Sequence, residues 1–130
     1  MEKDVVVIGG GPAGYAAAIR TAQMGGTSLL IEKNNLGGTC LNEGCIPTKV
    51  LYRNAEILKT LKNIENFGIH VDGYSIDIEK IQERKNNVID KLRNGILQLL
   101  KKNKVEVLYG IGKIQDKNTV EVILNNGEIR

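Results

Sequence analysis

Residues 4–14 read DVVVIGGGPAG, a run of three valines and an isoleucine followed at once by glycines. A short β-branched run of this kind predicts a buried parallel strand over residues 4–8. The small residues that follow predict a helix from residue 12 to about residue 24, ended by the glycines at 25–26. Residues 27–32 predict a second strand, so the whole stretch forms one βαβ unit of an α/β fold.

Three of these glycines, Gly9, Gly11 and Gly14, have the spacing of a loop that binds the phosphates of a dinucleotide. The first permits a tight turn, the second lets the backbone approach a pyrophosphate, and the third lets the helix pack on the strand. The helix N-terminus directs its amide groups and positive dipole end at the phosphates. Glu32, at the end of the second strand, can accept hydrogen bonds from an adenosine ribose. A Rossmann-like dinucleotide site is therefore predicted, although the glycine spacing alone does not distinguish FAD from NAD.

The rest of the chain predicts two more helices and further strands. One helix is expected over residues 48–64, and a long amphipathic helix is expected from an N-cap at Asp77 to about Lys102, packed on the sheet. A third strand is expected at 105–108, and in a doubly wound sheet the order third–second–first places the first strand at an edge. The antiparallel β-meander that follows is expected at residues 113–114, 119–124 and 128–130, with a turn at 125–127.

The composition is that of a soluble globular protein, with 130 residues of which 42% are hydrophobic and 25% charged. No apolar run reaches the length of a membrane span, and the first residues lack the pattern of a signal peptide, so we expect a cytoplasmic protein without membrane contact. The net charge is only +3, the basic residues are dispersed, and one Phe and no Trp give nucleic-acid bases little to stack on. We therefore expect no nucleic-acid partner.

Two cysteines, Cys40 and Cys45, lie in the sequence GGTCLNEGCIPTK at residues 37–49. A zinc site would need further Cys or His ligands, and His70 is the only histidine, so no metal site is expected. A structural disulfide across so short a loop would restrain the unfolded chain by only about 2 kcal/mol. In a reducing compartment such a pair is more often catalytic, redox-active or metal-binding than a structural staple. The sequence favours a redox couple over both alternatives.

If the two sulfurs bond, the segment that carries them cannot be one regular helix. Residues five apart in an α-helix have Cα atoms roughly 8–9 Å apart, whereas a disulfide needs less than about 7 Å. We therefore expect Cys40 to precede the regular helix, with Gly44 and Pro47 allowing the distortion. A helix N-terminus at this place would stabilise a thiolate. Lys49, on the same helical face as Cys45, is either a positive charge near that thiolate or an ordinary surface lysine.

The motif GTCLNxGCIPxK at residues 38–49, following an N-terminal GxGxxG, resembles the pyridine nucleotide–disulfide oxidoreductases. Weaker similarity extends over the whole chain, including the long helix and the third strand. Within the family the chain is most similar to the dihydrolipoamide dehydrogenases, with Thr48 where those enzymes usually have serine and glutathione reductases more often have lysine. A mercuric or glutathione reductase and a non-catalytic FAD- or nucleotide-binding module are the alternatives.

The resemblance implies a catalytic role for both cysteines in an FAD-dependent disulfide oxidoreductase. Cys40 would exchange with the dithiol substrate, and Cys45 would pass electrons to FAD through a charge-transfer thiolate. The residues that the resemblance and the glycine motif together assign to FAD binding are Gly9, Gly11, Gly14, Glu32, Lys33, Gly38, Thr39, Cys40, Lys49 and Gly112.

The resemblance also implies a larger enzyme around this chain. Residues 1–130 would be the N-terminal part of an incomplete Rossmann-like FAD-binding domain, without the NAD and dimerisation domains, and would be inactive alone. The intact enzyme would be a homodimer that oxidises dihydrolipoamide with NAD. Its partner would be the lipoyl domain of a 2-oxoacid dehydrogenase or glycine cleavage complex.

Overall fold

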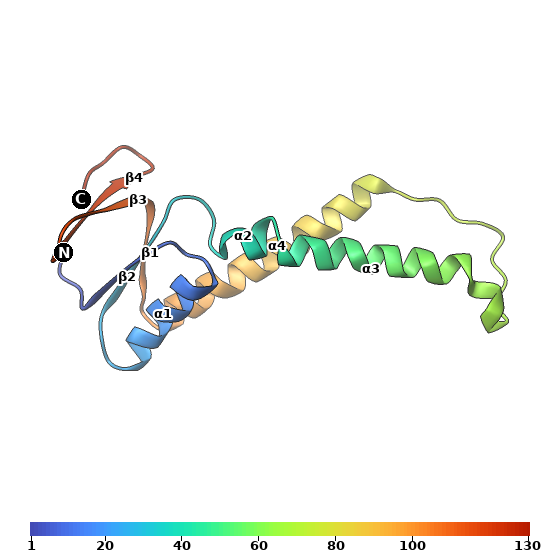
Figure 1. Cartoon of the computed structure of the whole chain (residues 1–130), viewed down its shortest axis with the longest axis horizontal. Coiled ribbons are helices and arrows are strands. Elements are labelled where there is room, and N and C mark those ends of the chain that lie inside the picture. Colours follow the sequence, from blue (N-terminus) through green and yellow to red (C-terminus); the bar gives the residue numbers. More distant parts are fainter.

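The computed structural model describes residues 1–130 and places a small sheet beside four helices (Figure 1). In chain order the elements are β1 (Val5–Ile8), α1 (Pro12–Gln23), β2 (Ser28–Glu32), α2 (Gly38–Asn42), α3 (Cys45–Lys62), the 3-10 helix η1 (Ile64–Phe67), α4 (Ile78–Lys102), β3 (Glu106–Asp116) and β4 (Thr119–Leu124). None of the helices combines the length and apolar character that crossing a bilayer requires. The expected α/β class is confirmed.

The sheet has the order β1-β2-β3-β4, in which the first three strands are parallel and β4 is antiparallel to β3. All five residues of β2 are buried, because this strand has a neighbour on each side and side chains packed on both faces. β1 lies at the edge, and its end residues Val5 and Ile8 remain 38% and 46% exposed. The expected order third–second–first is therefore confirmed.

β3 differs from the sequence prediction because it is a single long strand rather than a strand at 105–108 and a separate piece at 113–114. Its first residues, from Glu106 to Tyr109, pair with β2, and the stretch from Gly110 to Asp116 pairs with β4. At the switch point a Cβ on Gly110 would collide with the backbone of Ile123, so glycine permits the close crossing of β4 rather than ending the strand. Residues 128–130 turn back along β4 as expected, since Val122 and Arg130 exchange two backbone hydrogen bonds and the Leu124 amide donates to the Glu128 carbonyl. The pairing is only a single bridge at Ile129, however, and not a full third strand of the meander.

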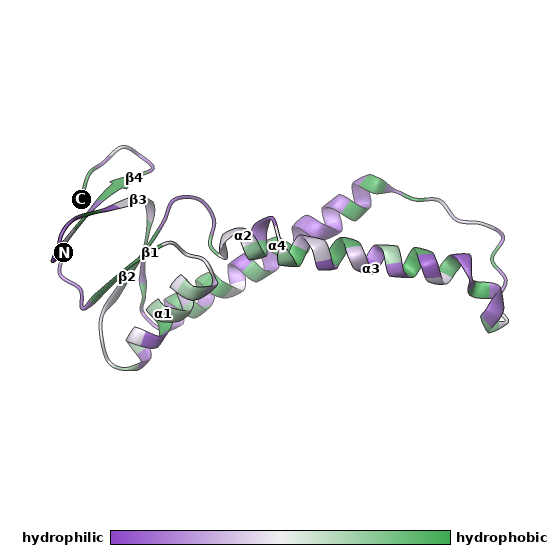
Figure 2. Ribbon diagram, viewed as in Figure 1, coloured by the Kyte–Doolittle hydropathy of each residue, from purple (hydrophilic) through white to green (hydrophobic).

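The main core lies between β2 and the helices. Ala18 of α1 and Leu100 of α4 are fully buried against Leu30 of β2, and Ile96 belongs to the same cluster. The C-terminal half of α4 thus packs on the sheet as expected. Its N-terminal half instead runs beside α3, and the two helices extend away from the sheet as an arm with apolar and polar residues alternating along each (Figure 2).

The structure tests two helix starts that the sequence predicted. Asp77 caps α4 as predicted, because its carboxylate accepts a hydrogen bond from the Lys80 amide at 3.0 Å. α3 begins at Cys45 rather than at residue 48, and Pro47 is accommodated because it lies in the first helical turn, where its missing N–H costs no hydrogen bond. The second cysteine consequently occupies the first residue of a long helix.

We expect the link between Asp4 and Thr27, which ties the start of β1 to the start of β2, to make stability depend on pH. The Asp4 carboxylate accepts from the Thr27 amide at 2.6 Å and from the Thr27 hydroxyl at 2.7 Å, and these bonds lower the pKa of Asp4 below its ordinary value of 3.8. A depressed folded-state pKa stabilises the fold above the unfolded value, and the contribution disappears as the pH falls through the folded value. Asp4→Asn should therefore lower the free energy of unfolding more at about pH 6 than at about pH 2 to 3.

Urea denaturation of both proteins at the two pH values measures this difference. Asp72→Asn, in the exposed connector before α4, is the matched control and should unfold like the wild type at both. An Asp4→Asn deficit that stayed constant across the acid range would contradict the titration of Asp4 as its cause.

Candidate functional site

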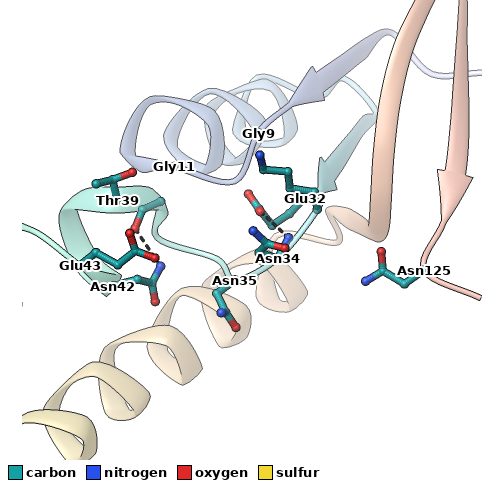
Figure 3. A pocket seen from close by; sticks show the side chains of 11 residues that line it. Gly9, Gly11, Glu32, Asn34, Asn35, Thr39, Asn42, Glu43 and Asn125 are labelled. Atoms are coloured by element: carbon teal, nitrogen blue, oxygen red, sulfur yellow. Dashed lines mark hydrogen bonds between the residues drawn. The ribbon is translucent and has the colours of Figure 1, made fainter.

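A cavity of about 520 Å³ opens where the β1–α1 loop, the end of β2 and α2 meet (Figure 3). No hydrophobic residue lines it, which suits the phosphate and ribose groups of a nucleotide better than an aromatic ring system. Its lining residues are Gly9, Gly11, Glu32, Lys33, Asn34, Asn35, Gly38, Thr39, Asn42, Glu43 and Asn125.

Glycine is required at two positions of the β1–α1 loop. Gly9 has a φ of 103°, in the left-handed region where L side chains are strained. A Cβ on Gly14 would overlap the carbonyl oxygen of Gly9, so only glycine lets α1 approach the end of β1 this closely. The predicted roles of the first and third glycines in the turn and in helix packing therefore have a direct structural basis.

Gly11 and Gly38 bring two separate segments together at the cavity. A Cβ on Gly38 would lie 2.9 Å from the Cα of Gly11, so the β1–α1 loop and the start of α2 pack backbone against backbone. Gly38 also has a φ of 60°. A larger residue at position 38 would push α2, and the cysteine that it carries, away from the nucleotide loop.

The N-terminus of α1 is open to an anion. Gly11 is its N-cap residue, no side chain caps it, and its first turn contains no acidic residue. The first amides of a helix have no intrahelical partner and sit at the positive end of its dipole. Because Gly11 lines the cavity, these donors fit a pyrophosphate placed there.

Glu32 holds the loops of the cavity together. One carboxylate oxygen accepts from the Gly10 amide at 2.7 Å and the other accepts from the Asn34 amide at 2.7 Å, while the residue is only 8% exposed. An ionised carboxylate offers about four acceptor positions. Two remain for donors in the cavity, which is compatible with a ribose hydroxyl. The chain's residues thus fit the adenosine diphosphate part of FAD.

Cys40 and Cys45 form a disulfide with their Cα atoms 4.7 Å apart. Cys40 lies in the short helix α2, and the backbone breaks at Glu43 and Gly44 before α3 begins. The expectation that Cys40 precedes the regular helix is confirmed, although the helical turn around it was not predicted. Thr48 donates a hydrogen bond from its hydroxyl to the Gly44 carbonyl at 2.7 Å, which secures the start of α3.

The predicted cofactor residues fall into two groups. Those that line the cavity are Gly9, Gly11, Glu32, Lys33, Gly38 and Thr39. The others lie outside it: Gly14 packs α1 on β1, Cys40 is disulfide-bonded, and Lys49 is exposed on α3. Gly112 lies on β3, where an added Cβ would contact Ile31 and Ile8. The assignment of all ten residues to FAD stays a prediction.

Several lining residues were not singled out from the sequence. Asn34 and Asn35 follow directly after Glu32, and Asn42 and Glu43 lie between the two cysteines, so their nearness to recognised motifs was an available signal. Asn125 follows β4 and reaches the cavity because β3 curls from β2 toward β4 (Figure 3). The sequence marks that residue only as part of the expected turn at 125–127 and not as part of a site.

Comparison with protein families gives a match along almost the whole chain. The profile described as pyridine nucleotide-disulphide oxidoreductase matches residues 3–129. The match includes the glycine loop, Glu32, both cysteines and the β3–β4 hairpin.

Individual relatives are also similar. A dihydrolipoyl dehydrogenase of Bacillus subtilis is 46% identical over 134 residues, covering 98% of this chain and 28% of the relative. Proteins of the same name from Chlamydia pneumoniae and Acholeplasma laidlawii are 48% and 45% identical, with 26% and 37% of their lengths covered. The chain therefore spans about a quarter to a third of the length of these relatives, and the resemblance noted from the cysteine motif is confirmed.

Proposed function

Because this chain belongs to the pyridine nucleotide-disulphide oxidoreductase family, we propose that it binds FAD and carries the redox-active disulfide of a dihydrolipoamide dehydrogenase. The observation that carries the proposal is the shared cavity. Gly9 and Gly11 of the nucleotide loop and Thr39 of the disulfide-bearing helix α2 line the same space. A dinucleotide bound there would lie directly beside the segment that ends in Cys45.

We propose that different parts of the polar lining hold different groups of the ligand. The open amides of α1 would hold the pyrophosphate, and Glu32 with Lys33 would face the adenosine ribose. Gly38 and Thr39 would lie along the molecule toward the flavin, with Lys49 on the adjoining helix near the ring. When bound, FAD supplies an acceptor for two electrons.

The disulfide supports a thiol–disulfide exchange in which the substrate dithiol is oxidised and the cysteine pair is reduced. A thiolate of the substrate dithiol attacks the Cys40 sulfur, the Cys40–Cys45 bond breaks, and Cys45 leaves as a thiolate. The second substrate thiol loses its proton and displaces Cys40, which takes up a proton as the substrate departs as a disulfide. Two electrons now reside on the cysteine pair. Cys45, as the first residue of α3, has its thiolate stabilised by the helix N-terminus.

The whole protein's activity is proposed on the same basis. We propose that electrons pass from the cysteine pair through FAD to NAD in a cytoplasmic homodimer. Its substrate is dihydrolipoamide on a lipoyl domain of a 2-oxoacid dehydrogenase or glycine cleavage complex. The names of the relatives support dihydrolipoamide over the substrates of mercuric or glutathione reductases.

FAD binding tests this proposal directly. The purified chain should bind added FAD, measured by quenching of flavin fluorescence, and Glu32→Gln should weaken binding by about tenfold or more because it removes a buried acceptor, an effect worth about 1.4 kcal/mol. Glu83→Gln on the exposed face of α4 is the matched control and should bind like the wild type. Failure of the folded wild-type chain to bind FAD would overturn the proposal.

A further inference from the structure

A side chain from α4 reaches the segment between the two cysteines. Arg93 donates from its Nε to the Asn42 side-chain oxygen at 2.5 Å, although the two residues are far apart in sequence. The Asn42 amide nitrogen in turn donates to the Gly38 carbonyl at 2.8 Å and to the Leu36 carbonyl at 3.1 Å. Asn42 therefore joins both ends of α2 to a charged group on another helix.

The Arg93 side chain is held in place by a contact of its own. Its guanidinium forms an ion pair with Asp90 at 3.0 Å, one turn earlier on α4, and its side chain is only 32% exposed. Ile89 and Ile96 on the same part of α4 are buried in the main core. Arg93 therefore lies on a part of α4 that is packed into the core and not at a helix end.

We propose that Arg93 is a positioning residue that sets the redox equilibrium of the Cys40–Cys45 pair by holding α2 through Asn42. In the oxidised chain the disulfide joins α2 to α3 covalently. On reduction that link is lost. The start of α2 is still held by the packing of Gly38 on Gly11, and the rest of α2 is held by the burial of Leu41 and by the Arg93–Asn42 contact. A fixed α2 keeps the two thiols close and raises the effective concentration of one for the other, which favours the disulfide.

The two redox states depend on the Arg93–Asn42 contact to different extents. Without the guanidinium, α2 gains freedom mainly in the reduced state, because the disulfide still restrains it in the oxidised state. The reduced state is therefore favoured, and the disulfide becomes the stronger oxidant. The inference rests on the proposed redox role of the cysteine pair, but not on flavin binding.

Equilibration of the full chain with glutathione and glutathione disulfide measures this equilibrium. Two glutathione thiols reduce the Cys40–Cys45 bond and become one glutathione disulfide, with both protons retained by the protein thiols. We expect Arg93→Met to lower the equilibrium constant for forming the protein disulfide by about threefold to tenfold, which corresponds to about 15–30 mV for a two-electron couple. Arg93→Lys, which keeps a donor and a positive charge, should restore part of the loss.

Two controls separate positioning from a general loss of stability. Arg84→Met removes another arginine of α4, one that contacts Val50 and Asn54 of α3 instead of α2, and should leave the equilibrium constant unchanged. In an Asn42→Ala background, Arg93→Met should have no further effect, because the contact is already absent.

The proposal would be overturned by an unchanged equilibrium constant in a folded Arg93→Met chain, or by an equal shift in the Arg84→Met control. An equal shift in the Asn42→Ala background would also overturn it. Since the titration needs no flavin, a chain that showed the expected shifts yet bound no FAD would contradict the proposed function and leave this inference standing.

Discussion

Cys45→Ser is expected to remove the long-wavelength charge-transfer absorbance that a dithiol produces in the flavin-loaded protein, while Cys40→Ser retains it. The asymmetry follows from the two positions. Cys45 is the first residue of the long helix α3, whose N-terminus stabilises a thiolate, whereas Cys40 lies in the short helix α2 on the other side of the break at Gly44. Only the Cys45 thiolate is proposed to contact the flavin.

Both substitutions should nevertheless abolish turnover of the dithiol in the complete enzyme. The two sulfurs act as a unit, because only their disulfide can accept two electrons and become two thiols. A single remaining cysteine has no disulfide to reduce, so activity should fall by more than about a thousandfold in either variant. Absorbance spectra taken during anaerobic titration with dihydrolipoamide, followed by turnover measurements with NAD, test both statements.

The control for a folding defect is the amount of FAD that each variant binds, which should be the same in both. The Cys40→Ser variant should show the long-wavelength band even before reduction, because its Cys45 has no disulfide partner. Cys45 is exposed and Cys40 is half-buried in the fold, and serine is nearly isosteric with cysteine, so the disulfide alone is lost. A charge-transfer band that persisted in Cys45→Ser and vanished in Cys40→Ser would reverse the assigned roles.

The parallel core was predictable because each element carries a strong local signal. The valine run of β1, the small residues of α1 and the Asp77 cap of α4 each agree with the tertiary fold, and all three appear as expected. The relation of the cysteines was also predictable, because helical geometry forbids a disulfide at this spacing unless the helix is interrupted.

The remaining features depend on contacts that no local pattern encodes. The strand expected at residues 105–108 continues through Gly110, whose missing side chain allows the close passage of β4. Asn125 reaches the cavity only because β3 changes partners from β2 to β4. Arg93 lies on a helix face that reads as ordinary polar surface, and its bond to Asn42 follows from how α4 crosses α2. Tertiary packing decided these positions.

Gly14→Ala is expected to lower the free energy of unfolding by more than about 3 kcal/mol and to eliminate FAD binding. The added Cβ would overlap the Gly9 carbonyl oxygen and lie 3.3 Å from Val7, so α1 would have to move away from β1. Because Ala18 of α1 is fully buried in the core, that movement would disturb the centre of the fold as well as the phosphate loop.

Alanine substitutions at two other glycines test whether the result is specific to the contact between Gly14 and Gly9. Gly95→Ala, at a helical position where the new Cβ meets nothing within 4 Å, should raise stability by about 0.5–1 kcal/mol. Gly11→Ala should leave stability within about 0.5 kcal/mol, because its backbone is extended and its Cβ would make only an ordinary 3.8 Å contact with Gly38.

Gly11→Ala should nevertheless weaken FAD binding by about tenfold or more, since its methyl group would project where the backbone has to approach a pyrophosphate. Urea unfolding and flavin-fluorescence titration of the three variants separate the two roles. A Gly14→Ala chain as stable as the wild type would show that α1 can shift without cost. A Gly11→Ala chain that bound FAD normally would show that the pyrophosphate does not lie at this loop, because the only change there is one methyl group in the path of the ligand.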